Sequence, residues 1–304
     1  MMLSTNTVIF EKNVGAKRGI ELAAKAGFDA VDFSLHHVMS SDNSVFNSEK
    51  YKEEAEKYRE LAEQNGIMFN QTHTVYPTSY SDGNKTATAV ERVKRGIEIS
   101  SILGAKTAVV HPMQHLVYLK GNNSEILKEI NKRFFGELAE LAEKLNITVC
   151  IENMWQRSAV SGNIVHSTCA DPLELAEYVD AIGSKHIAAC LDVGHCCLVG
   201  VDPADAVMAL GRKRLKALHL HDNDGKDDRH VLPFTEFVSK VNWESLLAAL
   251  AETGYDGDFT YEVNNSFTSS LLADEKVLLG KLIYAESIGR SMIDKIEKYK
   301  AKQM

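Results

Sequence analysis

The stretch LKALHLHDNDGKDDRH, residues 215–230, decides the fold of this chain. Its apolar run alternates up to His219 and His221 and then breaks into the polar loop 222–230. Because successive side chains of a strand point to opposite faces, both histidines are expected on one face, where the strand ends. Imidazoles and carboxylates at such a place are poor core residues but good metal ligands. The stretch therefore predicts a strand whose carboxyl end belongs to a metal site.

One module recurs on both sides of this stretch, namely a short apolar run, a loop and an amphipathic helix. Within residues 125–145 the apolar side chains recur every three or four positions, which predicts one buried stripe made of Ile126, Ile130, Phe134, Leu138, Leu141 and Leu145. The expected strands, with the opening stretch as the seventh, are Thr7–Phe10, Asp29–Leu35, Ile67–His73, Lys106–His111, Thr148–Glu152, Ile187–Asp192 and Asp258–Val263. The expected helices are Val14–Ala26, Glu49–Gln64, Thr86–Leu103, Glu125–Leu145, Pro172–Ile182 after the capping residue Asp171, Ala204–Leu210, Trp243–Thr253 and Ser270–Lys300.

Eight alternations of strand and helix without a linker between domains predict an α/β fold, a (β/α)8 TIM barrel. The barrel is expected to form a single domain over residues 1–304, with a long C-terminal helix from about residue 270. An open doubly wound sheet is the structural rival, but no GxGxxG or P-loop sequence supports it. We therefore expect the closed barrel.

The composition narrows the function classes. Of the 304 residues, 44% are hydrophobic and 25% are charged, which is ordinary for a globular protein. The formal net charge of −8 and the pI near 5.8 argue against a nucleic-acid partner. Five cysteines without CxxC spacing fit a reducing cytoplasm. The opening MMLSTNTVIFEKN does not resemble a signal peptide, and no run approaches about 18 apolar residues, so no membrane span is expected.

Six consecutive strands, the third to the eighth, place His, Asp or Glu at their carboxyl ends, where TIM barrels hold their active sites. These residues are His73, His111, Glu152, Asp192, the pair His219 and His221, and Glu262. Each alone could be an ordinary hydrogen-bonded group, but six buried at one mouth would need partners or a metal. Arg and Lys are scarce nearby, Arg157 and Arg229 being the nearest. The joint pattern predicts a divalent metal at the mouth.

The expected metal ligands come from four adjacent strands: Glu152, Asp192, His219 or His221, and Glu262. This mixture of carboxylates and imidazole suits Mn, Mg, Co or Zn, and the ligand types do not choose between them. His195, on the loop after Asp192, is expected to bind substrate or a further metal. Cys196 and Cys197 are expected to be buried, inert thiols. The Trp155 side chain could either pack in the core or form a platform on which a sugar ring stacks.

Six motifs occur in order over about two-thirds of the chain: VVHP at 109–112, IEN at 151–153, CLDVGH at 190–195, HLHDND at 219–224, DRH at 228–230 and GYDGDFTYEV at 254–263. Together they resemble the xylose isomerase-like barrel superfamily of sugar phosphate isomerases and epimerases. That superfamily includes sugar isomerases, ketose 3-epimerases, inosose dehydratases and endonuclease IV. As a set the motifs are specific for the superfamily, and they are much less specific for any one reaction.

The resemblance implies a metal ion, Mn or Mg in the sugar enzymes, held by Glu152, Asp192, His219 and Glu262. His219 is preferred because residues 219–222 match the family's HxxD form, although residues 221–224 match it too, which leaves His221 as the alternative. By the same resemblance, Glu152 and Glu262 would remove and return a proton next to a sugar carbonyl. The side chains expected to contact the substrate are His73, His111, His195, Trp155 and Arg229.

The predicted function is therefore a metal-dependent sugar isomerase or epimerase acting on a ketose, a keto-sugar or a related polyol. Two departures argue against a ketohexose. The ketohexose 3-epimerases carry a Glu where this chain has Ser158, and an Arg soon after the seventh-strand motif, where this chain has the acidic run DNDGKDD. An inosose or keto-sugar dehydratase or lyase shares the first proton removal and stays an alternative.

A trinuclear zinc endonuclease acting at abasic DNA, resembling endonuclease IV, is the runner-up. All nine ligand types of that family have a counterpart here: His73, His111, Glu152, Asp192, His195, His219, Asp228, His230 and Glu262. Against it, the loop after IEN reads MWQRS, HPMQH replaces the small residues after HP, and the acidic balance opposes a phosphodiester ligand. A non-catalytic barrel is disfavoured because Glu152 and Glu262 are both present. The expected partner is a small sugar or polyol, and the last helix or the 153–170 loop could pack a second copy into a homo-oligomer.

Overall fold

The computed structural model describes residues 1–11, 13–236 and 239–302. Its strands are β1 Leu3–Asn6, β2 Ala30–Ser34, β3 Met68–His73, β4 Thr107–Val110, β5 Thr148–Glu152, β6 Trp155–Arg157, β7 Ile164–His166, β8 Ile187–Asp192, β9 Leu215–His219 and β10 Phe259–Tyr261. Its α-helices are α1 Val8–Glu11, α2 Ala16–Ala26, α3 Leu35–Val38, α4 Tyr51–Gln64, α5 Gly83–Leu103, α6 Ser124–Leu145, α7 Pro172–Ile182, α8 Val193–Leu198, α9 Pro203–Arg214, α10 Trp243–Glu252 and α11 Glu275–Ala301. Short 3-10 helices are η1 Val45–Asn47, η2 Asn264–Phe267 and η3 Ser270–Ala273.

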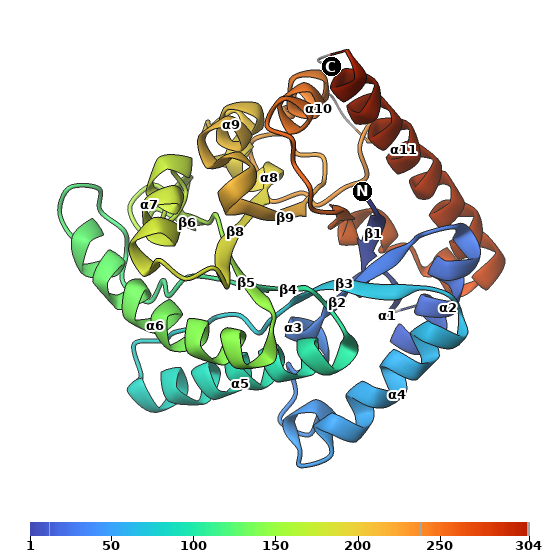
Figure 1. Ribbon diagram of the computed structural model, residues 1–304, viewed down its shortest axis with the longest axis horizontal. Helices are drawn as coiled ribbons and strands as arrows, with labels where there is room; N and C mark the ends of the chain where they lie inside the picture. Colours follow the sequence, from blue (N-terminus) through green and yellow to red (C-terminus); the bar gives the residue numbers. More distant parts are fainter. Residues whose placement is uncertain (12, 237–238, 303–304) are drawn as a thin grey trace.

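Eight parallel strands form one sheet in the order β10-β1-β2-β3-β4-β5-β8-β9, with helices around it (Figure 1). Just after β9, Leu220 pairs in parallel with Tyr261, and its amide donates to the carbonyl oxygen of Thr260 at 2.9 Å. These contacts bring the two edge strands together and nearly close the sheet. The fold is therefore the predicted (β/α)8 TIM barrel in a single domain. None of the helices described has the length and apolar character that a membrane span requires.

The helices begin and end where local chemistry allows. Asp171 caps α7 by accepting the amide of Leu173 at 2.9 Å, with Pro172 at the first helical position, as the sequence predicted. Gly104 ends α5 with φ 81°, a left-handed conformation that favours glycine. The C-terminal helix expected from about residue 270 starts only at Glu275, because Asp274 caps it and a 3-10 turn precedes it.

The expected first strand, Thr7–Phe10, is wrong. The strand is Leu3–Asn6, whose four residues are all buried between β10 and β2, and residues 8–11 form the helical turn α1. Phe10 then packs directly on Gly19 of α2, where a Cβ would lie 2.1 Å from the Phe10 side chain. The apolar run of residues 7–10, which predicts a strand, is thus helical from residue 8 because Phe10 packs against α2.

The stripe expected on α6 is right only in part. Phe134 and Leu138 are buried, but Ile126 is 57% exposed and Leu127 is buried in its place. Ile126 lies in the first turn of the helix, next to the surface groove between α5 and α6.

The inside of the barrel is filled with small side chains beneath the mouth. Val109, Cys150, Ala188, Cys190 and Ala217 form a cluster of their own there, separate from the large core between strands and helices. Such small residues leave room above them for the long polar side chains at the strand ends. The packing therefore sets the floor of the mouth.

Candidate active site

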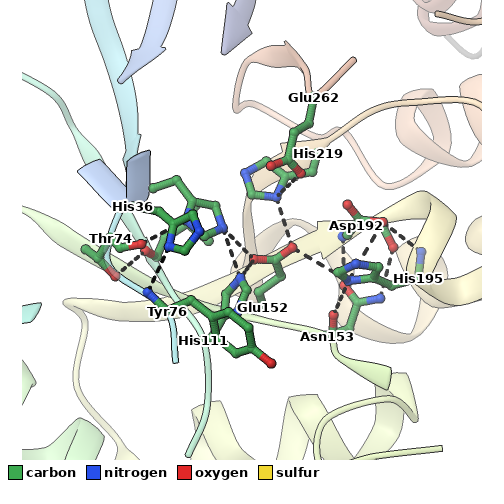
Figure 2. A network of polar contacts seen from close by, with 12 residues as sticks. His36, Thr74, Tyr76, His111, Glu152, Asn153, Asp192, His195, His219 and Glu262 are labelled. Atoms are coloured by element: carbon green, nitrogen blue, oxygen red, sulfur yellow. Dashed lines mark hydrogen bonds and ion pairs between the residues drawn. The ribbon is translucent and has the colours of Figure 1, made fainter. Parts of the chain in front are cut away.

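Glu152, at the end of β5, is the centre of the polar network at the mouth (Figure 2). Its side chain is 1% exposed. One carboxylate oxygen, Oε2, lies 2.8 Å from His111 Nε2 and 3.3 Å from His73 Nε2. The other, Oε1, lies 3.0 Å from His219 Nδ1 and 3.7 Å from His195 Nδ1. The structure thus brings Glu152 to four of the histidines that the sequence singled out.

Main-chain carbonyl oxygens orient four of the imidazoles. The Nδ1 atoms of His73, His195, His221 and His230 lie 2.8–3.2 Å from the carbonyl oxygens of Thr74, Asn153, Asp222 and Glu262. A carbonyl oxygen only accepts, so each Nδ1 carries a proton; in the neutral form of each ring the lone pair is then on Nε2. In metal-binding histidines, a hydrogen bond from the ring nitrogen that does not bind the metal to such an acceptor fixes the tautomer.

His219, at the end of β9, has the opposite orientation. Its Nδ1 faces two carboxylates, Glu152 at 3.0 Å and Glu262 at 3.3 Å. Its Nε2 lies 3.5 Å from Oδ2 of Asp32, which also accepts from Gln71 at 2.9 Å. Both His219 and Asp32 are buried. Asp32 is therefore a carboxylate partner for the His219 nitrogen that faces away from Glu152 and Glu262. The sequence did not predict this role, because a single acidic residue inside an apolar strand gives no sign of the residue that it contacts.

His221, the alternative ligand, belongs to a neighbouring set. Its Nε2 lies 3.0 and 3.1 Å from the two carboxylate oxygens of Asp192, and its ring stacks on His230 with 4.0 Å between centroids. The close approach depends on Gly194, because a Cβ there would lie 2.0 Å from the His221 ring. Of the two histidines, His219 is thus the one that joins Glu152 and Glu262.

Asp228 and His230, expected as further metal ligands, lie close to His195, which in turn lies next to Glu152. Asp228 Oδ1 lies 3.0 Å from His230 Nε2, and its Oδ2 lies 3.6 Å from His195 Nε2. His230 has φ 44°, an uncommon conformation for a residue other than glycine, of the kind that clusters at functional sites. The loop after β9 therefore returns a carboxylate and an imidazole to the mouth.

The charges of the site depend on one another. Burial alone would raise the pKa of the Glu152 carboxyl, but His219 and His111 hold that pKa well below its ordinary value. Burial would lower the pKa of the His230 imidazole, while Asp228 and Glu262 raise it to about 10. The pKa of His195 is likewise raised, against burial, by Asp192 and Asp228. The neighbouring carboxylates thus favour positive charge on His195 and His230, whereas burial lowers the pKa of His111.

The donor set fits divalent metal ions. Among the described residues, five sets have ligand atoms that lie within 4.8 Å of one another. Three of these sets together contain nine residues of the mouth: His73, His111 and Glu152; Glu152, Asp192, His219 and Glu262; and His195, Asp228 and His230. The other two are His73, His219 and Glu262, and Asp192, His221 and His230. In the first set, the Nε2 atoms of His73 and His111 face each other at 2.9 Å, and the buried Oε2 of Glu152, although close to both, has no well-aligned hydrogen bond. Imidazole and carboxylate donors at such spacing suit Zn, Mn or Co, whose ligands lie about 2.0–2.3 Å from the ion.

The remaining predicted residues lie around this centre. Trp155, at the start of β6, is half-buried with its ring 6.4 Å from that of His195. Arg229 points away to Asp224, at 2.9 Å, and is half exposed at the rim. Cys196 is buried, as predicted, and Cys197 is half-buried; burial raises the pKa of the Cys197 thiol to about 12.

Sequence reading also left three other residues of the mouth without a role. The Asn153 amide donates to the carbonyl oxygen of Asp192 at 2.9 Å and thereby joins β5 to β8. His36 and Tyr76 line the mouth beside His73 and His111. Two adjacent histidines after β2 were the only signal available for His36.

A model of the xylose isomerase-like TIM barrel family matches residues 20–279. The chain belongs to this family. Among curated proteins, an uncharacterized protein of Methanocaldococcus jannaschii is 32% identical over 178 residues, which is 58% of this chain and 57% of that protein. A probable endonuclease 4 of Bacillus licheniformis is 27% identical over 183 residues, 55% of this chain and 57% of its own length. The matches thus span a little over half the length of these relatives.

Two solved structures show the same barrel over nearly their whole length. A D-tagatose 3-epimerase-like protein has a TM-score of 0.69 at 22% identity and covers 94% of this chain and 100% of its own. An IolI protein with a bound zinc atom has a TM-score of 0.73 at 18% identity and covers 98% of this chain and 99% of its own. At these identities the likeness shows a shared barrel fold and nothing more.

Proposed function

We propose that the protein is a divalent-metal-dependent isomerase or epimerase that acts on a ketose, a keto-sugar or a related polyol. The observation that carries the proposal is the position of two glutamates. Glu152 and Glu262 lie 3.0 and 3.3 Å from one atom, Nδ1 of His219, and they come from the ends of β5 and β10. A substrate carbon near this point would have both carboxylates within reach.

The two carboxylates differ in access. The side chain of Glu262 is 18% exposed and that of Glu152 is 1% exposed. We assign removal of the proton next to the substrate carbonyl, and its return, to this pair of carboxylates; Glu262, which is open to the mouth, is the one that can exchange its proton with water. A divalent ion held by Glu152, Asp192, His219 and Glu262 would supply Lewis-acid stabilisation of the charge that develops as the proton leaves.

Features of the relatives and of the chain support this assignment. The D-tagatose 3-epimerase-like structure shares the barrel, and the IolI structure holds zinc in the same fold. Imidazole takes part beside carboxylates in every set, and this mixture suits Zn, Mn, Co or Mg. All five cysteines are free, as a reducing cytoplasm would keep them.

The test is hydrogen exchange in D2O. Purified protein loaded with Mn, Co or Zn is incubated with D-fructose, D-psicose, a 3-keto-glucoside and an inosose, and C–H exchange is followed by NMR. We expect exchange with at least one sugar, a decrease of about 10²–10⁴-fold in Glu262→Gln, and little change in the exposed control Glu252→Gln. Loss of water from the substrate would identify the lyase alternative, and no exchange with any metal would refute the proposal.

A second candidate function rests on a separate observation. The three ligand sets lie side by side and use all nine residues expected from the resemblance to endonuclease IV. Against a DNA substrate, both arginines of the rim are engaged by acids, Arg157 by Asp227 at 3.7 Å and Arg229 by Asp224 at 2.9 Å. Three zinc ions per chain, together with cleavage of an abasic duplex that Glu262→Gln abolishes, would replace the first proposal with this one.

A further inference from the structure

A second pocket adjoins the candidate active site on the side of β2 and β3. It has a volume of about 540 Å³ and lies between the loops that follow β2 and β3 and the first turns of α5. Its wall toward the metal ligands contains His36 and Tyr76, which Figure 2 shows beside His111. The ring of Tyr76 lies 4.4 Å from that of His111, and the ring of His36 lies 6.4 Å from that of His73. We name this space the outer pocket.

The outer pocket combines aromatic surface with neutral polar groups. Tyr76 and Tyr80 are each 39% exposed, which is high for large aromatic side chains beside a buried polar site. Asn84 and Thr88 of α5 also line the pocket and can hydrogen-bond to hydroxyl groups. His36 adds a ring that accepts the amide of Tyr76 at 3.2 Å, and burial lowers its pKa to about 4. A volume of this size is typical of small-ligand sites.

The charged groups of this pocket do not form an anion site. The first amides of α5 are taken by Asp82, which accepts from Asn84 at 2.8 Å and from Lys85 at 3.1 Å. Arg92 is paired with the carboxylate of Asp42. Among the described residues that line the pocket, Lys85 is then the one cation without an acid within 4 Å. This balance suits a neutral ligand with hydroxyl groups better than a phosphate.

We propose that the outer pocket binds a second glycosyl unit, so that the substrate is a disaccharide or another glycoside whose reacting ring lies at the metal ligands. The proposal rests on the proposed sugar-enzyme function and names its substrate class. The second ring stacks on Tyr80 and Tyr76, and its hydroxyl groups meet Asn84 and Thr88. Tyr76 forms the border between the two rings because its own ring contacts both spaces.

Binding to the full chain tests the inference. Saturation-transfer NMR titrations compare maltose, cellobiose, trehalose and sucrose with D-glucose, D-fructose and glucose 6-phosphate. We expect at least one disaccharide to bind about 10-fold more tightly than its component monosaccharides. Tyr80→Ala should weaken that binding about 3- to 10-fold, the worth of one aromatic contact, and Thr88→Trp should block it. The control Tyr284→Ala, at a tyrosine on α11 that is 54% exposed against 39% for Tyr80, should leave it unchanged.

Each outcome decides. Equal affinity for disaccharides and monosaccharides, no sugar binding at all, or disaccharide binding that ignores both Tyr80→Ala and Thr88→Trp overturns the inference. Binding of glucose 6-phosphate alone, sensitive to Thr88→Trp, also overturns it and marks an anion pocket. Disaccharide binding that depends on Tyr80 without hydrogen exchange in D2O supports the pocket and refutes the proposed function. Hydrogen exchange with equal kcat/KM for free sugars and glycosides, unaffected by Tyr80→Ala and Thr88→Trp, supports the proposed function and refutes the role of the outer pocket.

Discussion

Gly194→Ala is expected to damage the candidate active site by displacing His221. A Cβ at residue 194 would lie 2.0 Å from Cε1 and 2.5 Å from Nε2 of the His221 ring. Ordinary contact starts at 3.4 Å, so the ring would have to retreat by about 1.4 Å. Such a retreat would break the contact of 3.0 Å between Nε2 and Asp192 and disturb the ring stack on His230.

The magnitude follows from two terms. Overpacking a tight site costs about 1–3 kcal/mol. Leaving a buried hydrogen-bonding group without its partner costs a further ~1–3 kcal/mol. We therefore expect Gly194→Ala to lower the free energy of unfolding by about 2–6 kcal/mol, which is large for one methyl group.

Urea unfolding of four proteins isolates the cause: the native chain, Gly194→Ala, His221→Ala and the double variant. Once His221→Ala has removed the ring, Gly194→Ala should cost little, since alanine is favoured over glycine in a helix by about 1 kcal/mol. Gly136→Ala, on α6 with nothing within 4 Å of the added Cβ, is the matched control and should stabilise slightly. If Gly194→Ala costs the same with and without the ring, the reasoning from the close contact is refuted.

Three further predictions test other parts of the structure. Asp32→Asn should weaken divalent-metal binding about 10- to 100-fold by calorimetry, since Asp32 backs His219 at 3.5 Å, and an unchanged affinity would exclude that role. Burial raises the pKa of Glu174 to about 7, so this carboxyl favours folding at low pH and loses its contribution as pH rises from about 4.5 through 7. Glu174→Gln should therefore raise Tm by roughly 2–4 °C more at pH 8 than at pH 4.5, and a shift independent of pH would contradict the assignment. Ellman's reagent should label the native protein slowly and only at half-buried Cys197, whereas all five thiols react after denaturation, and rapid labelling of the native chain would speak against inert cysteines.

The positions of the polar strand ends could be predicted from the sequence because parallel strands of a barrel end on one face. Glu152, Asp192, His219 and Glu262 each follow an apolar run, and the topology alone brings them together. Periodicity could not foresee that residues 8–11 turn into α1, because the packing of Phe10 on Gly19 joins two separate elements.

The division of labour inside the site was also hidden from the sequence. His219 and His221 both fit the family motif, and only ring orientation separates them: one Nδ1 faces Glu152, and one Nε2 faces Asp192. Asp32 was missed for a similar reason, since its partner lies 187 positions along the chain. Distances between side chains on different strands carry this information, and residue spacing does not.

The carbonyl oxygens that hold four imidazoles have a consequence for how such a barrel changes over time. Every residue type has a carbonyl oxygen, so replacing Thr74 or Asn153 does not remove the acceptor that aims His73 or His195. Because the main chain orients these imidazoles, substitutions of the surrounding side chains leave their orientation in place. Neighbouring loops can therefore acquire a new specificity while the metal-binding geometry is inherited unchanged.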